Sequence, residues 1–99
     1  MIASAKSAEA SGNFAAAQEH YGNAAERLRF SNPAEAERLQ ELAGKNVGKI
    51  LGVDQPTTSV NGKSTITPAL SNKLKLYQKQ ANIPVTGVID QTTRRALAR

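Results

Sequence analysis

The sequence predicts an all-α protein in which a helical hairpin, residues 1–31, is joined to a three-helix module, residues 32–99. Two observations predict this class. Apolar residues recur every three or four positions in successive segments, as on the buried face of a helix, and a capping residue or a proline precedes most of these segments. Ninety-nine residues suffice for one compact domain or two helical subdomains that share a core.

The first two helices are expected over residues 2–11 and from Phe14 onward. The first segment is rich in alanine, and Gly12-Asn13 supplies a helix stop followed by an N-cap. Gly22 interrupts the second helix at a cost of about 1 kcal/mol relative to alanine, and we expect it to permit a close helix approach. The stripe that should pack on the first helix consists of Phe14, Ala17, Tyr21, Ala24, Ala25 and Leu28.

The third helix is expected to begin after Asn32 and to run to about Leu51. Asn32-Pro33 is a strong start signal, and Glu35 is placed to bond back to the cap. Gly44 and Gly48 weaken this helix and are expected to bend it or to end it early. Its inner side should consist of Leu39, Leu42, Ala43, Val47 and Ile50.

The segment Gly52–Thr67 is rich in Gly, Thr, Ser and Pro, and it is expected to form a minimal β-hairpin or an irregular loop. Asn61-Gly62 is the turn signal, because both residues tolerate the positive φ angles of a type I′ turn. A fourth helix should follow Thr67-Pro68, and Asp90 should cap a short last helix. The inner stripe of the fourth helix should be Leu70, Leu74, Tyr77 and Ala81.

Residues 70–97 show a distinctive order of elements. A helix that carries Tyr77-Gln78 near its end runs into the turn Ile83–Gly87, and it is followed by Ile89-Asp90, Thr93 and Ala96-Leu97. This order resembles the peptidoglycan-binding-domain-like family. The resemblance implies a three-helix module that tethers other activities to bacterial cell wall.

A sequence pattern that occurs twice in the chain extends the resemblance over residues 35–69. Val60-Asn61-Gly62 precedes one capped helix as Val85-Thr86-Gly87 precedes the other, although Asn61 stands where the family has an acidic residue. Four of the family-type residues have a structural explanation as turn and cap residues, namely Gly62, Gly87, Asp90 and Thr93. Gln78 is expected to hydrogen-bond the Val85–Gly87 turn.

The hairpin at residues 1–31 resembles a single tetratricopeptide-type unit in the spacing of Gly12, Phe14, Ala17, Tyr21 and Ala24. It is also similar to the helical-bundle domains of microtubule-interacting and trafficking proteins. One such unit cannot bury its apolar face alone, because these repeats are stable by stacking on neighbours. We therefore expect the hairpin not to be independently stable.

Charge divides unevenly along the chain. Residues 1–44 carry four Lys and Arg against six Glu, a net −2, whereas residues 45–99 carry nine against two Asp, a net +7. The basic half should attract polyanions such as wall carboxylates, teichoic phosphates or nucleic acid. The chain has no cysteine, which excludes disulfides and thiolate metal sites.

The candidate ligand-binding surface combines the fourth and fifth helices. Lys75 and Lys79 are four residues apart and share a helix face, and the last helix, with its arginines, should pack antiparallel to this one. With Tyr77 as its one aromatic, the surface lacks stacking platforms for nucleic-acid bases. The candidate residues are Lys75, Tyr77, Lys79, Asn82, Arg94 and Arg95, with Arg99 close by in sequence.

No catalytic or cofactor-binding pattern is found, so we expect neither an enzyme nor a bound cofactor or metal. Gly44–Lys49 does not match a phosphate loop. The spacing between its glycines is too short, the Ser or Thr that would hold magnesium is missing, and no β-strand is expected before it. His20 is the single histidine and lacks a second metal ligand at helical spacing. The glutamates do not form the carboxylate pair of a wall hydrolase.

The leading functional hypothesis is non-catalytic binding of peptidoglycan, which would anchor a larger wall-associated or phage assembly. The alternatives are a protein–protein adaptor that uses the N-terminal hairpin, and polyanion or nucleic-acid binding through the basic half. Met1–Ser4 is not followed by a hydrophobic signal core, and no apolar run is long enough to span a membrane. Localisation therefore stays open between a virion or lysis-released protein, a fragment of an exported protein, and a cytoplasmic protein.

Overall fold

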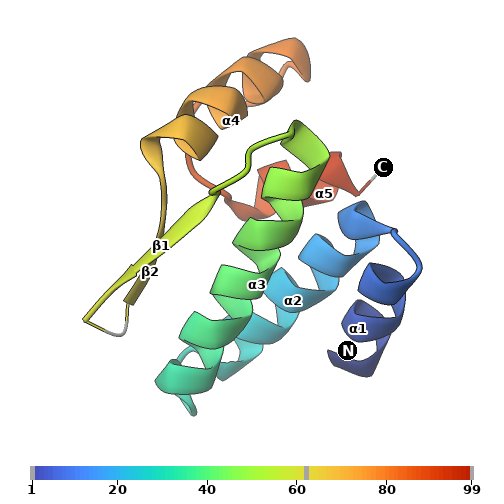
Figure 1. Cartoon of the computed structure of the whole chain (residues 1–99), viewed down its shortest axis with the longest axis vertical. Helices are drawn as coiled ribbons and strands as arrows, with labels where there is room; N and C mark the ends of the chain where they lie inside the picture. The colour runs from blue at the N-terminus through green and yellow to red at the C-terminus, as the bar shows by residue number, and fades with distance from the viewer. Residues whose placement is uncertain (1, 62, 99) are drawn as a thin grey trace.

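The computed structural model describes residues 2–61 and 63–98. Within these ranges, five helices and one two-stranded antiparallel sheet follow one another along the chain (Figure 1). They are α1 (Ile2–Ala10), α2 (Phe14–Leu28), α3 (Pro33–Leu51), β1 (Thr57–Val60), β2 (Lys63–Ile66), α4 (Pro68–Gln80) and α5 (Gln91–Leu97). Helix accounts for 65% of the chain, so the all-α prediction is confirmed.

The first three helices lie side by side (Figure 1) and share a core made mostly of alanine. α2 packs on both α1 and α3, and more extensively on α3. Asn13 caps α2 as predicted, with its side-chain oxygen accepting a hydrogen bond from the N–H of Ala16 at 3.2 Å. The buried members of this alanine core are Ala5, Ala17, Tyr21, Ala24, Ala25, Leu39 and Ala43. Small side chains allow close helix packing, but each buries little apolar surface.

α3 begins as predicted, with one difference in its capping. Asn32 Oδ1 accepts a hydrogen bond from the N–H of Glu35 at 3.3 Å. The carboxylate of Glu35 does not bond back to the cap but pairs with Arg38. The reason is that the N–H of Asn32 already donates to the carbonyl oxygen of Leu28 at 2.8 Å.

The glycines of α3 mark places where other segments touch the helix. A Cβ atom on Gly44 would lie 2.7 Å from Thr57 Cγ2 of β1, and one on Gly48 would collide with the ring of Pro56. α3 does not end early at either glycine but continues to Leu51. Glycine is needed here because the loop before β1, and β1 itself, lie against the helix backbone.

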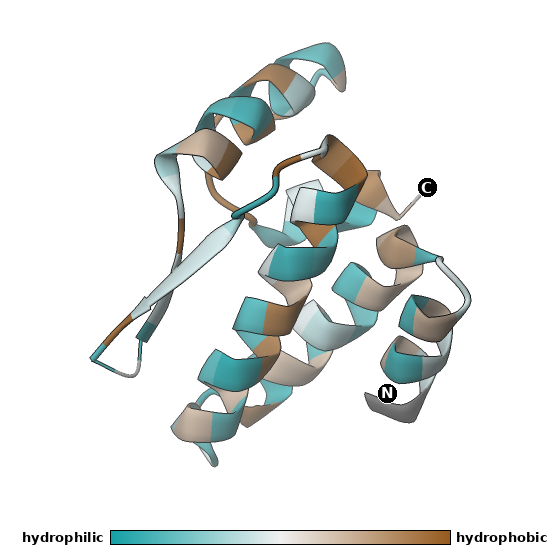
Figure 2. Cartoon of the chain, viewed as in Figure 1, coloured by the Kyte–Doolittle hydropathy of each residue, from teal (hydrophilic) through white to brown (hydrophobic). Residues whose placement is uncertain are grey.

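The predicted hairpin is present, with β1 and β2 paired along their whole length. Asn61 has φ of +54°, as a type I′ turn requires, while Gly62 lies outside the described residues. The N–H of Ser64 donates to Glu37 Oε2 at 3.1 Å, which ties β2 to α3. Figure 2 shows a β1 that is neither strongly hydrophilic nor strongly hydrophobic over most of its length, as its Thr and Ser residues dictate.

The three-helix module has a second core of larger aliphatic side chains. Its buried members are Val47, Leu70, Leu74 and Leu97, and they are surrounded by Leu51, Val53, Ile66, Tyr77 and Ile89. Thr67 caps α4 as predicted, because its hydroxyl oxygen accepts a hydrogen bond from the N–H of Leu70 at 3.4 Å. This leucine core joins α3, α4, α5 and the β-hairpin into one unit.

Two predicted core residues are in fact exposed. Ile50 is 36% exposed, since α3 turns Leu51 inward at this point. Ala81 is exposed as the C-cap of α4, and the polar Gln78 is buried in the preceding turn. Within the described ranges, no helix is both long and apolar enough to cross a membrane.

Candidate functional site

Gln78 holds the loop between α4 and α5 in one conformation. Its side-chain oxygen accepts hydrogen bonds from the N–H groups of Thr86 and Gly87, both at 3.0 Å. Its amide nitrogen lies 2.8 Å from Thr93 Oγ1 and 3.1 Å from the carbonyl oxygen of Val88. Gln78 is fully buried, so the predicted bond from this residue to the Val85–Gly87 turn is confirmed and also reaches α5.

Gly87 is required in this turn for two reasons. Its φ is +74°, where a side chain is strained, and a Cβ atom would lie 2.9 Å from Ser71 Oγ and 2.8 Å from Lys75 Cε. The hydroxyl of Ser71 donates to the Gly87 carbonyl oxygen at 2.8 Å, which joins the turn to α4. The turn role predicted for Gly87 is therefore confirmed.

Asp90 caps α5 as predicted. Its Oδ1 accepts a hydrogen bond from the N–H of Thr93 at 2.9 Å, and its Oδ2 accepts one from the Thr86 hydroxyl at 3.1 Å. Burial acts to raise the pKa of the Asp90 carboxyl, but the hydrogen bonds from Thr93 and Thr86 outweigh it and hold that pKa below its ordinary value. Asp90 is therefore a charged cap at neutral pH.

α5 packs more closely on α2 than on α4, which differs from the predicted α4–α5 pair. Arg94 is the reason, because its side chain lies across Gly22 of α2, where any Cβ atom would collide with it. The amide of Gln18 donates to the carbonyl oxygen of Arg94 at 2.7 Å. The close approach predicted for Gly22 is thus confirmed, with α5 as the helix that it admits.

The guanidinium of Arg94 also bonds to α2. Its Nη2 donates to Glu26 Oε1 at 2.8 Å, and the two side chains are 9% and 47% exposed, respectively. Arg94 Nε is buried and has no hydrogen-bond partner among residues 2–61 and 63–98. The arginine is therefore a nearly buried cation with a single, half-solvated counter-ion.

A groove of about 550 Å³ opens between α2, α3, the hairpin and the start of α5. α2 contributes Gly22 and Glu26 to its walls, and Arg29, the C-cap residue after α2, adds to them, while the β-hairpin and α3 contribute mostly hydroxyl and amide groups. The remaining lining residues are Gln40, Ala43, Thr57, Ser64, Thr65, Ile66, Val88, Ile89, Asp90, Gln91 and Arg94. Its volume lies in the range of small-molecule sites.

Residues 37–97 match the family described as "Putative peptidoglycan binding domain". The match covers more than half of the chain. The chain belongs to the peptidoglycan binding domain family. No curated protein and no solved structure matches it. The family assignment confirms the resemblance seen in residues 70–97, and the matched range also includes the hairpin and most of α3.

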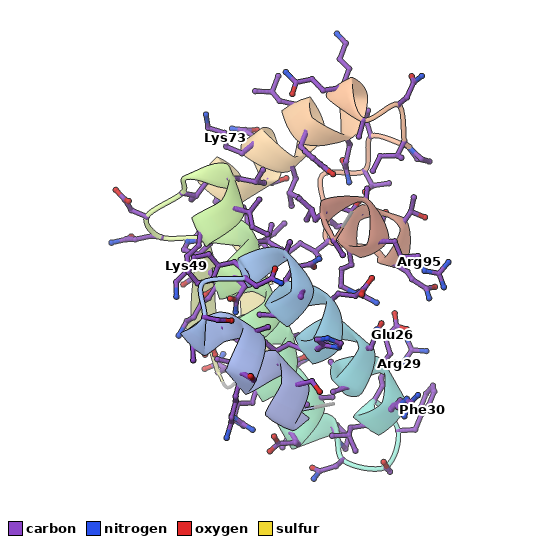
Figure 3. All side chains as sticks on the ribbon, turned by 90° about the vertical axis from the view of Figure 1, so that its right-hand side faces the viewer. Glu26, Arg29, Phe30, Lys49, Lys73 and Arg95 are labelled. Atoms are coloured by element: carbon purple, nitrogen blue, oxygen red, sulfur yellow. The ribbon has the colours of Figure 1, made fainter. Side chains whose placement is uncertain are left out.

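In this peptidoglycan binding domain, the predicted surface residues separate into two groups. Lys75 and Lys79 are exposed on α4, and the stem of Lys75 lies over Gly87. Arg95 is exposed on α5, and Figure 3 shows it on the same edge of the molecule as Glu26 and Arg29, opposite to Lys49 and Lys73.

Three other predicted candidates have structural roles in the fold. Arg94 is buried under α2, and Tyr77 is half-buried against the leucine core. Asn82 is exposed but has φ of +64°, so it serves to end α4 in a conformation that asparagine tolerates well. Arg99 lies outside the described residues.

The groove itself was missed by the sequence-based prediction. It depends on contacts between α2 and α5, with Glu26 and Arg94 68 residues apart in the sequence. One signal was present, since Gly22 in the middle of a helix indicated that another element comes close. The sequence did not indicate which element that would be.

Proposed function

We propose that this protein binds peptidoglycan without cleaving it, and that it anchors a larger wall-associated or phage assembly. The observation that carries the proposal is the family match over residues 37–97, which covers the hairpin, α4, α5 and most of α3. The groove is the favoured binding surface because it is concave and is lined by hydroxyl and amide groups from the matched module.

The chemistry of the groove supports binding in place of hydrolysis. A glycosidase needs two carboxyl groups, one of which has a raised pKa. Of the two carboxylates that line the groove, Glu26 is paired with Arg94, and Asp90 caps α5 with a lowered pKa. Among the described residues, no group of three or more His, Cys, Asp or Glu could hold a metal ion.

Sedimentation with insoluble peptidoglycan tests this proposal. We expect the purified protein to pellet with peptidoglycan at about 0.15 M salt and to remain bound at about 1 M salt, where purely ionic contacts are screened within about 3 Å. The double variant Gln40→Ala, Gln91→Ala should reduce pelleting, since both side chains line the groove. Gln80→Ala, an exposed site outside it, is the matched control.

A wall-clearing assay tests the absence of hydrolysis. We expect no loss of turbidity when the protein is added to a cell-wall suspension at neutral pH. Clearing by purified protein would contradict the non-catalytic proposal, whereas binding that disappears at about 1 M salt and is unaffected by the Gln40→Ala, Gln91→Ala variant would favour simple polyanion attraction through the basic half.

One observation favours the adaptor alternative. Phe30, at the end of the N-terminal hairpin, is 85% exposed, and the Arg29 guanidinium lies 4.8 Å from its ring centroid. Phenylalanine and arginine are both enriched in protein–protein interfaces relative to the rest of the surface. If Phe30→Ser abolishes assembly with a partner but leaves peptidoglycan sedimentation unchanged, both functions reside in one chain.

A further inference from the structure

Helix α2 forms one wall of the groove, although it lies outside the family-matched residues 37–97. It contributes Gly22 and Glu26, its C-cap residue Arg29 also lines the groove, and it covers Arg94 of the matched module. The N-terminal hairpin therefore does more than stabilise the module. It adds Glu26 and Arg29 to the charged residues Asp90 and Arg94 that the matched part places in the groove.

Arg94 gives this wall hydrogen-bond donors that its single counter-ion does not use up. A guanidinium has five N–H donors, yet Arg94 forms one side-chain hydrogen bond within the described residues, to Glu26, and its Nε–H has no acceptor. Its side chain is 9% exposed, so water compensates little of the charge. A carboxylate entering the groove could share the guanidinium with Glu26 and form a charge-assisted bond.

Arg29 adds a second cation on the same wall. It is exposed, lines the groove and forms no ion pair within residues 2–61 and 63–98. Asp90, the acidic residue on the other side, already accepts hydrogen bonds from Thr86 and Thr93. The lining thus holds two guanidiniums and two carboxylates, but the Asp90 oxygens already accept hydrogen bonds, so the donors that remain available on this wall are guanidinium N–H groups, which favour an acceptor such as a carboxylate.

The lining favours a peptide over a sugar chain. None of the described residues that line the groove is aromatic, so no flat face is available on which a sugar ring could stack. The side chains of Gln40, Gln91 and Thr65 instead offer amide and hydroxyl groups that can pair with the N–H and C=O groups of a peptide. About 550 Å³ suits a short peptide.

We propose that α2 converts the family module into a receptor for a carboxylate of the peptidoglycan stem peptide, with Arg94 as the anchor and Arg29 as the second contact. This inference rests on the proposed function and names the part of peptidoglycan that is bound. The glycan strand, on this view, makes only peripheral contacts outside the groove.

Calorimetric titration of the full chain with three soluble probes tests the inference. The probes are a synthetic stem peptide with free carboxylates, the same peptide with every carboxyl amidated, and a chitin oligosaccharide. We expect the first to bind, and the second to bind at least about tenfold more weakly, since a hydrogen bond to a charged group is lost. The oligosaccharide should not bind measurably.

Variants of individual arginines then show which residues bind the peptide carboxylate. Arg29→Gln should weaken binding of the free peptide about tenfold, whereas Arg27→Gln, two residues earlier in the last turn of α2 and outside the groove, should leave it unchanged. Arg94→Lys keeps the charge and loses the planar fork, so it should weaken binding as well. Its thermal melting reports whether the variant is folded, and Arg29→Gln tests the site independently of that result.

The outcomes separate this inference from the proposed function. Equal binding of free and amidated peptide, or equal effects of Arg29→Gln and Arg27→Gln, would overturn the carboxylate receptor. Whole peptidoglycan that sediments the protein while the stem peptide fails to bind would also overturn it and leave the proposed function intact. Failure of both whole peptidoglycan and peptide would overturn the proposed function itself.

Discussion

The two cores of this molecule contain different kinds of side chain. Around α1 and α2 the core is mostly alanine, with Tyr21 and Leu39. The module formed by α3, the β-hairpin, α4 and α5 instead contains buried leucine and valine side chains and a buried Gln78. An alanine side chain buries far less apolar area than a leucine side chain. Because burial stabilises the fold by about 25 cal/mol per Å² of apolar area, each alanine contributes less. We therefore expect the N-terminal hairpin to depend on its neighbours for stability, and the module to be stable through its own core.

The two cores also differ in their relation to the family match and to the groove. The leucine core and the Gln78 network lie within the family-matched range and fix the α4–α5 loop. The alanine core instead brings α2 close enough for Gly22 to receive Arg94. On our proposal, the N-terminal hairpin holds Glu26 and Arg29 beside the groove of the module.

Cutting the chain at the boundary between the cores should have the largest effect. We expect a peptide of residues 1–31 to be unfolded, because an alanine face cannot offset an ordering cost of about 1–2 kcal/mol per residue. Residues 33–99 should still fold, with a lower melting temperature because Leu39 and Ala43 lose their cover. Circular dichroism melting checks both fragments, and cooperative melting of the 1–31 peptide would refute the contrast.

Matched deletions within the intact chain compare the two cores directly. Leu74→Ala should destabilise the protein by about 2–5 kcal/mol, since it leaves a cavity at a fully buried leucine. Ala17→Gly, at an equally buried site in the alanine core, should cost about 1–2 kcal/mol from helix propensity and one lost methyl. Urea denaturation measures both changes, and equal costs would show that the cores do not differ.

Replacing the polar centre of the module should have an intermediate effect. Gln78→Leu has a similar volume but leaves the N–H groups of Thr86 and Gly87 without their buried acceptor. We expect a loss of about 1–3 kcal/mol in the free energy of unfolding, the cost of unsatisfied buried groups. Hydrogen exchange should quicken at Thr86 and Gly87 first. Unchanged exchange there would mean that the turn does not depend on Gln78.

Local signals in the sequence were sufficient for the elements and insufficient for the groove. Asn32, Thr67 and Asp90 cap the predicted helices because capping involves residues three positions apart. Gln78 was linked to its turn because the two are eight or nine residues apart. Arg94 was misplaced on an open surface, since its burial depends on the distant α2, and one-dimensional spacing does not specify how α5 packs on that helix.

The cap of α5 provides a smaller, pH-dependent effect. Asp90→Ala should cost about 0.5–2 kcal/mol at neutral pH through loss of the cap. Asp90→Asn retains an acceptor and should cost a few tenths of a kcal/mol, from the missing charge at the helix start. Urea midpoints of the three proteins at neutral pH measure these differences.

The sign of the pH dependence follows from the lowered pKa of Asp90. Its charge contributes stability that is fully present above the pKa of the unfolded chain, near pH 4, and that is lost as pH falls through the lower folded-state pKa. The gap between wild type and Asp90→Asn should therefore close on acidification below about pH 4. A gap that stays constant down to pH 2 would show that the charge of Asp90 contributes nothing.

The smallest effect on stability is expected on the exposed face of α4. The double variant Lys75→Glu, Lys79→Glu should change the free energy of unfolding by less than about 0.5 kcal/mol, as exposed substitutions usually do. Its sedimentation with peptidoglycan decides between two surfaces. If the groove beside α2 is the binding site, the variant keeps its binding at about 1 M salt, where the reversed charges are screened. If binding is abolished at every salt concentration while the protein stays folded, the wall-contacting surface lies on α4, and the module then functions without the charged groups that the N-terminal hairpin supplies.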